Sequence, residues 1–398
     1  MDKKINIIII GVNYFGEMAS TQRIRNLFEP LFEIIDMSVV NFAINDKNII
    51  NFKSKVSSRK FNYNYWNPFS ILAFLFSISF YSIRNYNKNS RNIIYHYGYP
   101  SLENIFFLKI AKFWGYKIVY DIVENISHAD HGKSSLRLKL KSWSSRKMLK
   151  QLYKNGSLCF AISNGLLDYL TNLCKNKIPV IHLPICIDVN RVYSFKNDKL
   201  SNSMCEPIKV FYGGSFGFKD GFEYLLEGFE LACETNSNIE LVLTGKISKQ
   251  MNGKVQTLIS SSKFKQRISF LGCLSETDYY ATMVNSDILC MNRINSAYAN
   301  FGFPFKLGEY LASGNAIIAT KVGDVPQYLV NGQNALVIKP ELSIEICNAI
   351  LILAQDQDLR LKLGKAAYDT TSIFFSGQKV SKVLLENLIA LYDPKDKN

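Results

Sequence analysis

The chain has 398 residues, of which 47% are hydrophobic and 20% charged, and its formal net charge at pH 7 is +14. This is a globular composition, long enough for two domains that each bury a full core, so no disulfide or metal is needed to hold the fold. The basic balance leaves nucleic acid, an anionic membrane surface and phosphorylated substrates open as partners.

The eight cysteines include no C-x-x-C pair, and several lie in apolar runs such as "SLCFAIS" and "DILCMN". We therefore expect small buried residues in a reducing compartment, not zinc ligands. His128 and His131, in "HADH", are a weak metal signal by themselves. The sequence predicts no bound metal and no separate cofactor.

Strand-like and helix-like segments alternate through the first half of the chain. The opening "KINIIII" is an unbroken apolar run with no cleavage site after it, which favours a buried strand of a parallel sheet over a signal peptide. Further strands are predicted at 91–97, 117–123, 158–163 and 179–185, with helices at 20–32 and 102–115.

The segment from Phe69 to Ile83, "FSILAFLFSISFYSI", is apolar nearly all round. It is shorter than the roughly 20 residues that span a bilayer. We predict a buried helix, with a helix that dips into a membrane surface as the alternative.

The alternation stops after Asp188, where a polar stretch to residue 207 predicts a linker, and it resumes at Ile208. Strands are predicted at 208–213, 239–245, 267–272, 286–291, 315–320 and 334–338, and helices from about 343 to 392. The sequence thus predicts two Rossmann-like doubly wound α/β domains, 1–190 and 208–370, facing a cleft, and a helix at 371–392 that packs back toward the first domain.

Ligands of open parallel sheets bind beyond the carboxyl ends of the strands, so the loops there are the candidate binding sites. In "VFYGGSFGFKDG", Gly213, Gly214 and Gly217 would let backbone approach an anion, and Lys219 would add charge. No Walker A motif and no G-x-G-x-x-G follows any strand, which argues against a nicotinamide enzyme. A plain glycine-rich turn is the alternative.

Two further strand exits carry glycines, Gly245 in "TGK" and Gly272 in "LGCL". With "FGFPFKLGE" they would gather at one edge of the second sheet. Lysines there could bind phosphates and a carboxylate could bind a ribose diol, so we expect a nucleoside diphosphate site.

These pieces, in this order and ending in "FPFKLGEYLASGNAIIATKVGDVPQYLVNGQNALVI", resemble the second domain of family 4 glycosyltransferases, which have the GT-B fold. The resemblance covers about 208–392. It extends more faintly to the first domain, through the Gly11 to Gly16 loop and "AIS…LPICID" ending at Asp188.

The resemblance implies roles for individual residues. Lys219 matches the family lysine that contacts the donor diphosphate, and Glu309 matches the glutamate that holds the donor ribose. Gly272 and Leu274 match the stretch whose backbone contacts the nucleobase. Gly16 matches the glycine loop that faces the phosphates, and Gly214 and Gly245 complete the expected donor site.

The sequence departs from the family pattern in two places. Phe301 stands where many members have a first glutamate, and Ser215 stands where they have an arginine beside the glycines. Lys306 or Arg293 is expected to replace that positive charge. We further expect Glu309 to open a helix, whose N-terminus would keep the carboxylate ionised. Solvated or helix-stabilising charges are the structural alternatives for Lys306 and Glu309.

Acceptor chemistry is expected in the first domain, after "KIVYDIV". Asp121 near the end of this run, and Glu124, His128 and His131 after it, could bond sugar hydroxyls or position the donor sugar. Glu124 and His128 are our candidates for catalytic contact with a sugar. Structural hydrogen bonding is the alternative.

The stretch from Lys133 to Lys154 has eight Lys and Arg and no acid. It predicts a basic amphipathic helix for an anionic membrane surface, with a solvated helix face as the alternative.

We therefore predict a retaining, metal-independent glycosyltransferase that uses a nucleotide sugar and a saccharide or lipid-linked acceptor in cell-surface polysaccharide or glycolipid synthesis. We expect a cytoplasmic protein, with a peripheral position on the inner face of the cell membrane as an extension. A nucleotide-sugar epimerase of the same fold is the rival enzyme. A nucleic-acid-binding protein is the rival outside the enzymes, although no recognised nucleic-acid motif is present.

Overall fold

The computed structural model describes residues 4–12, 19–43, 56–62, 68–98, 104–124, 152–196, 206–247 and 249–392, with some positions between 143 and 150. The chain divides into two compact units. Unit 1 comprises Met1–Cys186 and Gly377–Asn398, and unit 2 is Ile187–Ser376.

Unit 1 is built on a parallel sheet of seven strands in the order β3-β2-β1-β4-β5-β6-β7. Every residue of β1 is buried, as expected for a strand covered on both faces. The strands are β1 (Ile5–Ile10), β2 (Ile35–Ala43), β3 (Val56–Asn62), β4 (Arg91–Tyr97), β5 (Lys117–Ile122), β6 (Leu158–Ala161) and β7 (Val180–His182).

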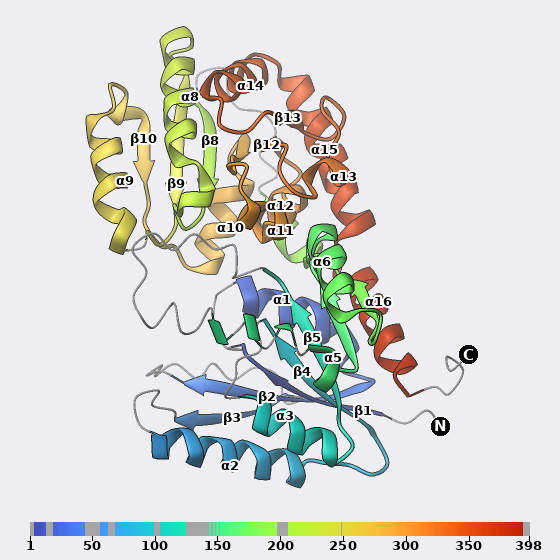
Figure 1. Cartoon of the computed structure of the whole chain (residues 1–398). Helices are drawn as coiled ribbons and strands as arrows, with labels where there is room; N and C mark the ends of the chain where they lie inside the picture. Colours follow the sequence, from blue (N-terminus) through green and yellow to red (C-terminus); the bar gives the residue numbers. More distant parts are fainter. Residues whose placement is uncertain are drawn as a thin grey trace. The chain divides into compact units, whose positions relative to one another are not determined.

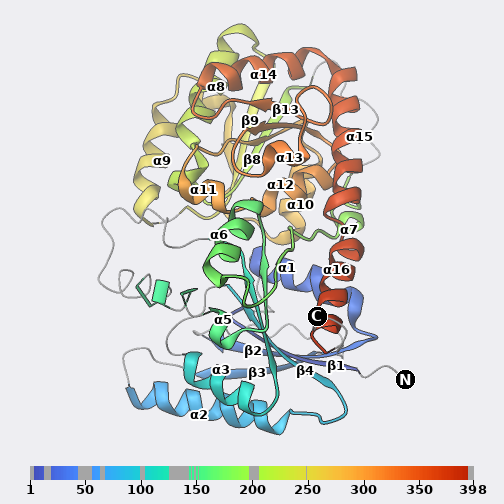
Figure 2. The same ribbon diagram turned by 45° about the vertical axis from the view of Figure 1, so that its right-hand side comes forward.

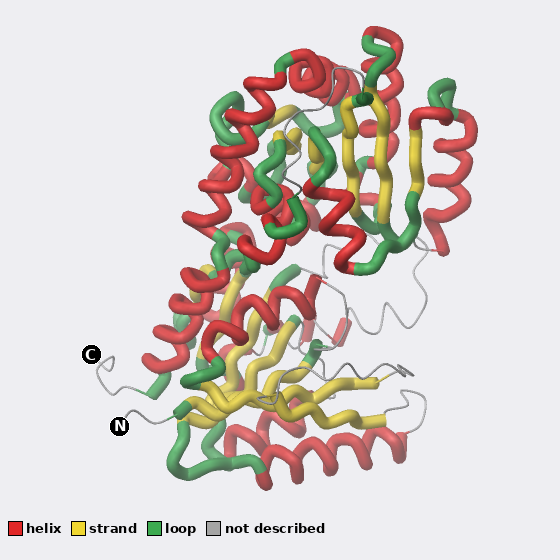
Figure 3. Tube along the Cα trace, turned by 180° about the vertical axis from the view of Figure 1, so that it is seen from behind, coloured by secondary structure: helices red, strands yellow, loops and turns green. Residues whose placement is uncertain are grey.

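Helices cover both faces of this sheet (Figure 1). The helices α1 (Ala19–Phe28) and α16 (Gly377–Ala390) pack with Ile5, Ile7 and Ile9 of β1 in one core. The other face carries α2 and α3, which run side by side (Figures 1 and 3). Remaining elements are η1 (Glu29–Leu31), α2 (Pro68–Arg84), α3 (Asn104–Phe113), α5 (Leu152–Asn155) and α6 (Asn164–Cys174).

Unit 2 has a parallel sheet of six strands in the order β10-β9-β8-β11-β12-β13. Its strands are β8 (Ile208–Gly213), β9 (Ile239–Thr244), β10 (Ile268–Phe270), β11 (Ile288–Met291), β12 (Ala316–Thr320) and β13 (Leu336–Ile338). Its helices are α7 (Val189–Tyr193), α8 (Phe222–Thr235), α9 (Lys249–Ser261), α10 (Glu276–Val284), α11 (Ala297–Phe301), α12 (Phe305–Ala312), α13 (Val325–Tyr328), α14 (Ser343–Gln355) and α15 (Gln357–Phe374), with η3 (Phe218–Asp220) and η4 (Lys265–Arg267) (Figure 2).

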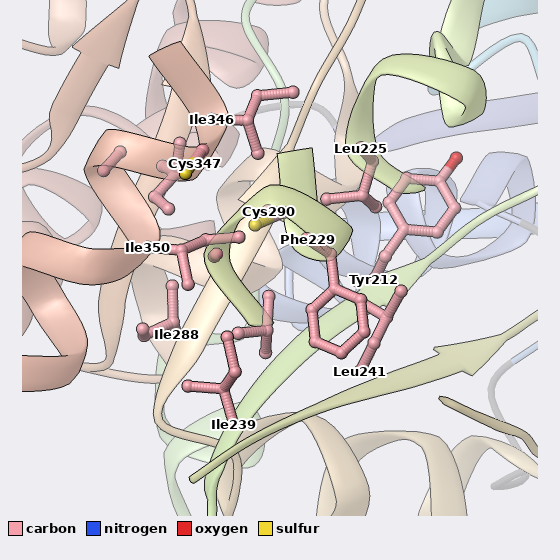
Figure 4. Packing of buried hydrophobic residues seen from close by; sticks show 14 of the residues in the cluster. Tyr212, Leu225, Phe229, Ile239, Leu241, Ile288, Cys290, Ile346, Cys347 and Ile350 are labelled. Carbon is pink, nitrogen blue, oxygen red and sulfur yellow. The ribbon is translucent and has the colours of Figure 1, made fainter. Parts of the chain in front are cut away.

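The core of unit 2 lies between the sheet and the pair α8 and α14 (Figure 4). Val210 and Tyr212 of β8 point into this core, whereas Phe211 between them packs against Tyr279 of α10 and Tyr310 of α12 on the opposite face. The sheet is therefore covered on both sides, and the predicted doubly wound α/β architecture is confirmed.

Three local expectations need correction. The strands β2 and β3 were not predicted, because Asp36 and Ser38 interrupt the apolar run of the first and the second is mostly polar. The expected linker after Asp188 begins with α7, whose first turn is capped by the Asp188 carboxylate. The segment from Phe69 to Ile83 is helical but only half of it is buried, since one side of α2 faces solvent.

Candidate functional site

The carboxyl ends of three neighbouring strands are joined through their glycines. The Gly214 amide donates to the Thr244 carbonyl at 2.9 Å, and the Gly245 amide donates to the Gly272 carbonyl at 2.7 Å. The Thr244 hydroxyl donates to the same carbonyl at 2.8 Å. The loops that follow these strands, predicted from "YGGSF", "TGK" and "LGCL", therefore lie together at one edge of the sheet of unit 2.

Gly245 is required by this arrangement. Its φ of +139° lies outside the range of ordinary residues, and a Cβ atom there would lie 1.7 Å from the Gly214 carbonyl oxygen. Gly272 is different: its φ is +67°, but a Cβ atom would meet nothing within 4 Å. Gly272 thus leaves open space beside the end of β10, and Leu274 two residues further on is half-buried.

The loop after β8 is folded around the carboxylate of Asp220, which is 3% exposed. The Gly217 amide and the Ser215 hydroxyl donate to Asp220 Oδ2 at 3.0 and 3.1 Å. From β11, the Asn292 amide group donates to the Asp220 carbonyl at 2.8 Å. The hydroxyl of Ser215 therefore supports the loop, and the side chain brings no positive charge to the site.

Lys306 reaches the same carboxylate from the first turn of α12. Its Nζ lies 3.6 Å from Asp220 Oδ1 and 4.1 Å from the centroid of the Tyr212 ring. Nζ is also 2.8 Å from where a Cβ atom of Gly214 would stand, so only glycine leaves it this position. Burial lowers the pKa of Lys306 to about 8, although the charge of Asp220 acts in the opposite direction.

Lys219 and Arg293 add two more cations to this group. The Lys219 Nζ lies 4.7 Å from the Tyr298 ring centroid, and Arg293 is 8% exposed at the end of β11. Burial would raise the pKa of Asp220, but the charges of Lys306, Arg293 and Lys219 outweigh it and the pKa is lowered. Three cations around one carboxylate leave an excess of positive charge, which suits a polyanionic ligand.

Glu309 lies in the second turn of α12 and is 8% exposed. The hydroxyls of Tyr280 and Tyr279 donate to its two carboxylate oxygens at 3.0 and 3.3 Å. Burial raises the pKa of Glu309 to about 7, against the lowering effect of these two hydrogen bonds.

The expectation that Glu309 opens a helix was wrong. The helix α12 begins at Phe305, so the carboxylate is one turn inside it, and the tyrosines of α10 stabilise its charge in place of a helix N-terminus. Tyr279 and Tyr280 were missed by the sequence reading. The adjacent tyrosines in "SETDYYATM", directly after the Gly272 loop, were the available signal.

The acceptor-side candidates of unit 1 are only partly described. Glu124 is half-buried just beyond β5, whereas Gly16, His128 and His131 lie outside the described residues. Asp121 is committed elsewhere, because it is fully buried, pairs with Arg23 and accepts a hydrogen bond from the Tyr95 hydroxyl. The expectation that Asp121 could bond sugar hydroxyls is therefore wrong.

The described part of the chain shows neither a cluster of metal-binding side chains nor a disulfide. No group of three or more His, Cys, Asp or Glu side chains there could hold a metal ion. Six of the described cysteines are buried, and Cys273 beside Gly272 is exposed.

Residues 195–370 match the family model for glycosyl transferases group 1. The chain is 23% identical over 345 residues to an uncharacterized glycosyltransferase of Methanocaldococcus jannaschii, a match that covers 77% of this chain and 84% of the relative.

Among solved structures, the fold is similar to that of sucrose-phosphate synthase from Thermosynechococcus elongatus. Its TM-score is 0.77 at 15% identity, over 98% of this chain and 99% of the other. It is also similar to Anabaena HepE in complex with UDP-glucose, with a TM-score of 0.73 at 14% identity over 97% and 100% of the two chains. The family match, which spans most of unit 2, and the shared fold show that residues 195–370 resemble the glycosyl transferases group 1 family and that the chain has the fold of GT-B glycosyltransferases.

Proposed function

We propose that the chain transfers a sugar, with retention of anomeric configuration, from a nucleotide-sugar donor to a saccharide or lipid-linked acceptor of cell-surface polysaccharide or glycolipid synthesis. The observation that carries the proposal is the group of Lys219, Lys306 and Arg293 around Asp220, beside the joined strand exits. The UDP-glucose complex of HepE, a protein of similar fold, supports a donor of the same chemical class.

The cations would act on the leaving diphosphate. Negative charge grows on the phosphate oxygens as the bond to the sugar breaks, and fixed positive groups in a partly dehydrated site stabilise that charge. In the proposed complex Lys219 and Lys306 contact the diphosphate and Arg293 adds to the field. Asp220 keeps Lys306 in position before the donor binds.

The arginine that many relatives have at the position of Ser215 would be replaced by Lys306. The ammonium group already lies between Asp220 and Gly214, within the glycine loop, although its backbone belongs to a distant part of the sequence. Ser215 supports the loop through its hydrogen bond to Asp220, and we keep it among the donor-site residues in that role.

Glu309 would hold the donor ribose. Each carboxylate oxygen accepts one hydrogen bond from a tyrosine and retains a second lone pair. Two vicinal hydroxyls can donate to those remaining positions. Gly245, Gly272 and Leu274 would lie against the nucleoside, and the absence of a side chain at Gly272 leaves space there.

A dedicated base is not required in this scheme, since the leaving phosphate oxygen can take the proton of the attacking acceptor hydroxyl. Acceptor contacts are proposed for Glu124 and His128, and a phosphate contact for Gly16, on the basis of sequence position alone.

Lys219→Ala should lower kcat/KM for the nucleotide sugar, because the lysine meets charge that increases in the transition state. One charge-assisted hydrogen bond contributes about 1.5–3 kcal/mol, which corresponds to roughly a ten- to hundredfold loss. Lys263→Ala is the matched control, since its side chain is 81% exposed on the same unit. A folded Lys219→Ala variant with unchanged kcat/KM removes this lysine from the site.

The donor should be identified first by thermal shift against UDP, GDP, ADP and their sugars. A ligand at 100 times its Kd stabilises the folded state by about 2.7 kcal/mol. Product analysis by NMR, with and without acceptors, then gives the linkage and its configuration. Conversion of the donor sugar without an acceptor would indicate an epimerase, and a gel shift at physiological salt without nucleoside diphosphate binding would indicate a nucleic-acid-binding protein.

A further inference from the structure

The helix α2 presents an apolar face to solvent. Phe69, Leu72, Phe76 and Phe80 are 81%, 52%, 63% and 64% exposed. Their spacing of three and four residues places them on one side of the helix, and Arg84 continues the same row at the end. Single exposed apolar residues are ordinary on a protein surface, but a continuous row of large ones marks an interaction site.

Two serines of α2 are buried on its protein side. Ser79 and Ser82 are 4% and 1% exposed, and their hydroxyls donate to the backbone carbonyls of Leu75 and Ser79. The Tyr116 hydroxyl donates to the Ser82 carbonyl from the protein side. A helix selected only for solubility would expose its serines and bury its phenylalanines, whereas α2 buries these two serines and exposes three of its phenylalanines.

The apolar row continues onto α3. The rings of Phe76 and Phe106 meet edge to face at 6.2 Å between centroids. Phe106, Phe113 and Trp114 are 47%, 87% and 44% exposed. We call these residues of α2 and of the α3 segment the aromatic face: Phe69, Leu72, Phe76, Phe80, Phe106, Phe113 and Trp114. Figures 1 and 3 show α2 and α3 on the side of the unit 1 sheet away from α1.

Positive charge surrounds the aromatic face. Arg84, Lys88, Lys109 and Lys112 are exposed on or next to it. Between residues 68 and 120 the sequence has one acid, Glu103, which lies outside the described residues.

The exposed apolar residues of α14 and α15 have a different setting. Ile344, Ile352 and Leu361 are also about half exposed or more, but Glu345 and Asp358 stand among them. Among the exposed apolar residues of α2, α3, α14 and α15, those of the aromatic face therefore combine large apolar side chains with charge of a single sign.

We propose that the aromatic face binds the anionic surface of a lipid bilayer, with its rings in the headgroup region and its cations against lipid phosphates. Aromatic side chains and basic residues on one surface are the combination that interfacial helices use. A second copy of this chain fits less well, because it would bring the same cations face to face. The inference is independent of the proposed function, and it would place a lipid-linked acceptor beside unit 1.

The contact is peripheral in this proposal. The helix α2 has 17 residues, and no helix among the described residues is long and apolar enough to cross a membrane. This adds a defined surface to the expectation for Lys133 to Lys154, most of which lies outside the described residues. At its described end, α5 contacts α3, and the exposed Lys112 donates to the Lys154 carbonyl at 2.9 Å.

Vesicle flotation of the full chain, without donor or acceptor, tests the proposal. Vesicles of phosphatidylglycerol mixed with phosphatidylcholine should bind the protein. The double variant Phe76→Ser/Phe80→Ser should bind these vesicles at least about tenfold more weakly, because two exposed rings no longer enter the interface. The control Ile352→Ser/Leu361→Ser removes exposed apolar residues from unit 2 and should bind like the parent. Both variants should keep nucleoside diphosphate binding.

Charge is tested separately with Arg84→Gln and Lys109→Gln. Each should weaken binding to anionic vesicles by about fivefold, since each cation near such a surface contributes a binding free energy of that size. Each should also make the binding less dependent on salt concentration. Trp114 is a local fluorescence probe, because it is the one remaining tryptophan in the variant Trp66→Phe/Trp143→Phe. When this variant binds vesicles, the Trp114 emission should shift to the blue and be quenched by brominated lipid.

Two results would overturn the proposal. One is unchanged vesicle binding by Phe76→Ser/Phe80→Ser with no shift of the Trp114 emission. The other is a parent dimer in light scattering that this variant converts to monomer, with no binding to vesicles, which would assign the aromatic face to a second copy.

Discussion

Two buried ionisable side chains in α12 carry pKa values close to neutrality, Glu309 at about 7 and Lys306 at about 8. Burial disfavours the charged form of both. In Glu309 the carboxylate is ready to accept hydrogen bonds from a polar ligand, and in Lys306 the ammonium is ready to meet an anion. Site residues whose charges are unfavourable in the empty protein gain the most from a ligand that compensates them.

Glu309→Gln should lower the affinity for the nucleotide by roughly tenfold, about 1.4 kcal/mol, because an amide oxygen is a weaker acceptor for the ribose diol. The ratio of parent to variant affinity should rise with pH as Glu309 ionises around pH 7, because both proteins lose the charge of Lys306 alike around pH 8. Calorimetric titration at pH 5.5, 7 and 8.5 measures this. A variant that binds nucleotide like the parent at all three values excludes Glu309 from the ribose site.

Glu309→Gln should lower nucleotide affinity but raise the stability of the folded protein above about pH 7. The pKa of Glu309 is raised in the folded state, so the folded protein holds a proton more tightly than the unfolded chain, and this group lowers stability as pH rises from about 4.5 to 7. Glu309→Gln removes that penalty. Its Tm relative to the parent should therefore be higher at pH 8 than at pH 5. The exposed Glu386→Gln is the control and should show no such trend.

At the scale of elements, the site depends on how closely the ends of β8 and β9 approach. The backbone of Gly245 touches that of Gly214 so closely that no side chain fits at position 245. The strands bring the loops together, and the loops then position Asp220 and the cations around it. A small change in this backbone contact should therefore displace the groups of the ligand site, even though no charged residue is replaced.

Gly245→Ala should lower Tm and weaken nucleotide binding together, because a methyl group would collide with the Gly214 carbonyl at a backbone angle that alanine rarely adopts. Gly253→Ala is a matched control: Gly253 is exposed within α9, where a Cβ atom meets nothing within 4 Å. That change should stabilise the protein by about 0.5–1 kcal/mol and leave binding intact. Parent-like Tm and affinity in Gly245→Ala would contradict the role given to this contact.

At the scale of the whole molecule, the last helix belongs to the first unit. Leu384 and Leu388 of α16 are fully buried in the core that contains β1 and α1, and the Ser381 hydroxyl donates to the Leu27 carbonyl at 2.7 Å. Unit 1 is therefore completed by residues that follow unit 2 in the chain.

Leu384→Ala should destabilise unit 1 by about 2–5 kcal/mol, the usual cost of a cavity at a fully buried leucine. Hydrogen exchange resolved by peptide should show lost protection in β1 and α1, with β8 and β9 unchanged, and nucleotide binding should persist. Val383→Ala, at a residue 37% exposed on the same helix, should change stability by about 0.5 kcal/mol or less. Equal loss of protection in both units after Leu384→Ala would show that they unfold as one.

The parallel α/β class and the glycine-containing loops after the strands of unit 2 could be predicted from the sequence alone. Runs such as "NIIII" and "IELVL" carry their own signal, because a strand covered on both faces is mostly apolar and a glycine must stand where backbone meets backbone. The polar edge strand β3 gave no such signal. The family pattern, being local in sequence, identified Lys219 and Glu309 as candidates in the same way.

Only the tertiary structure decided which charges meet. That Lys306 faces Asp220, that Tyr279 and Tyr280 donate to Glu309, and that Asp121 is occupied by Arg23 are contacts between residues 29 to 98 positions apart. The outward orientation of the exposed phenylalanine rings of α2 is likewise a result of tertiary packing. Periodicity shows that a helix is apolar on every side, but which side faces the protein is set by the sheet and helix it packs against.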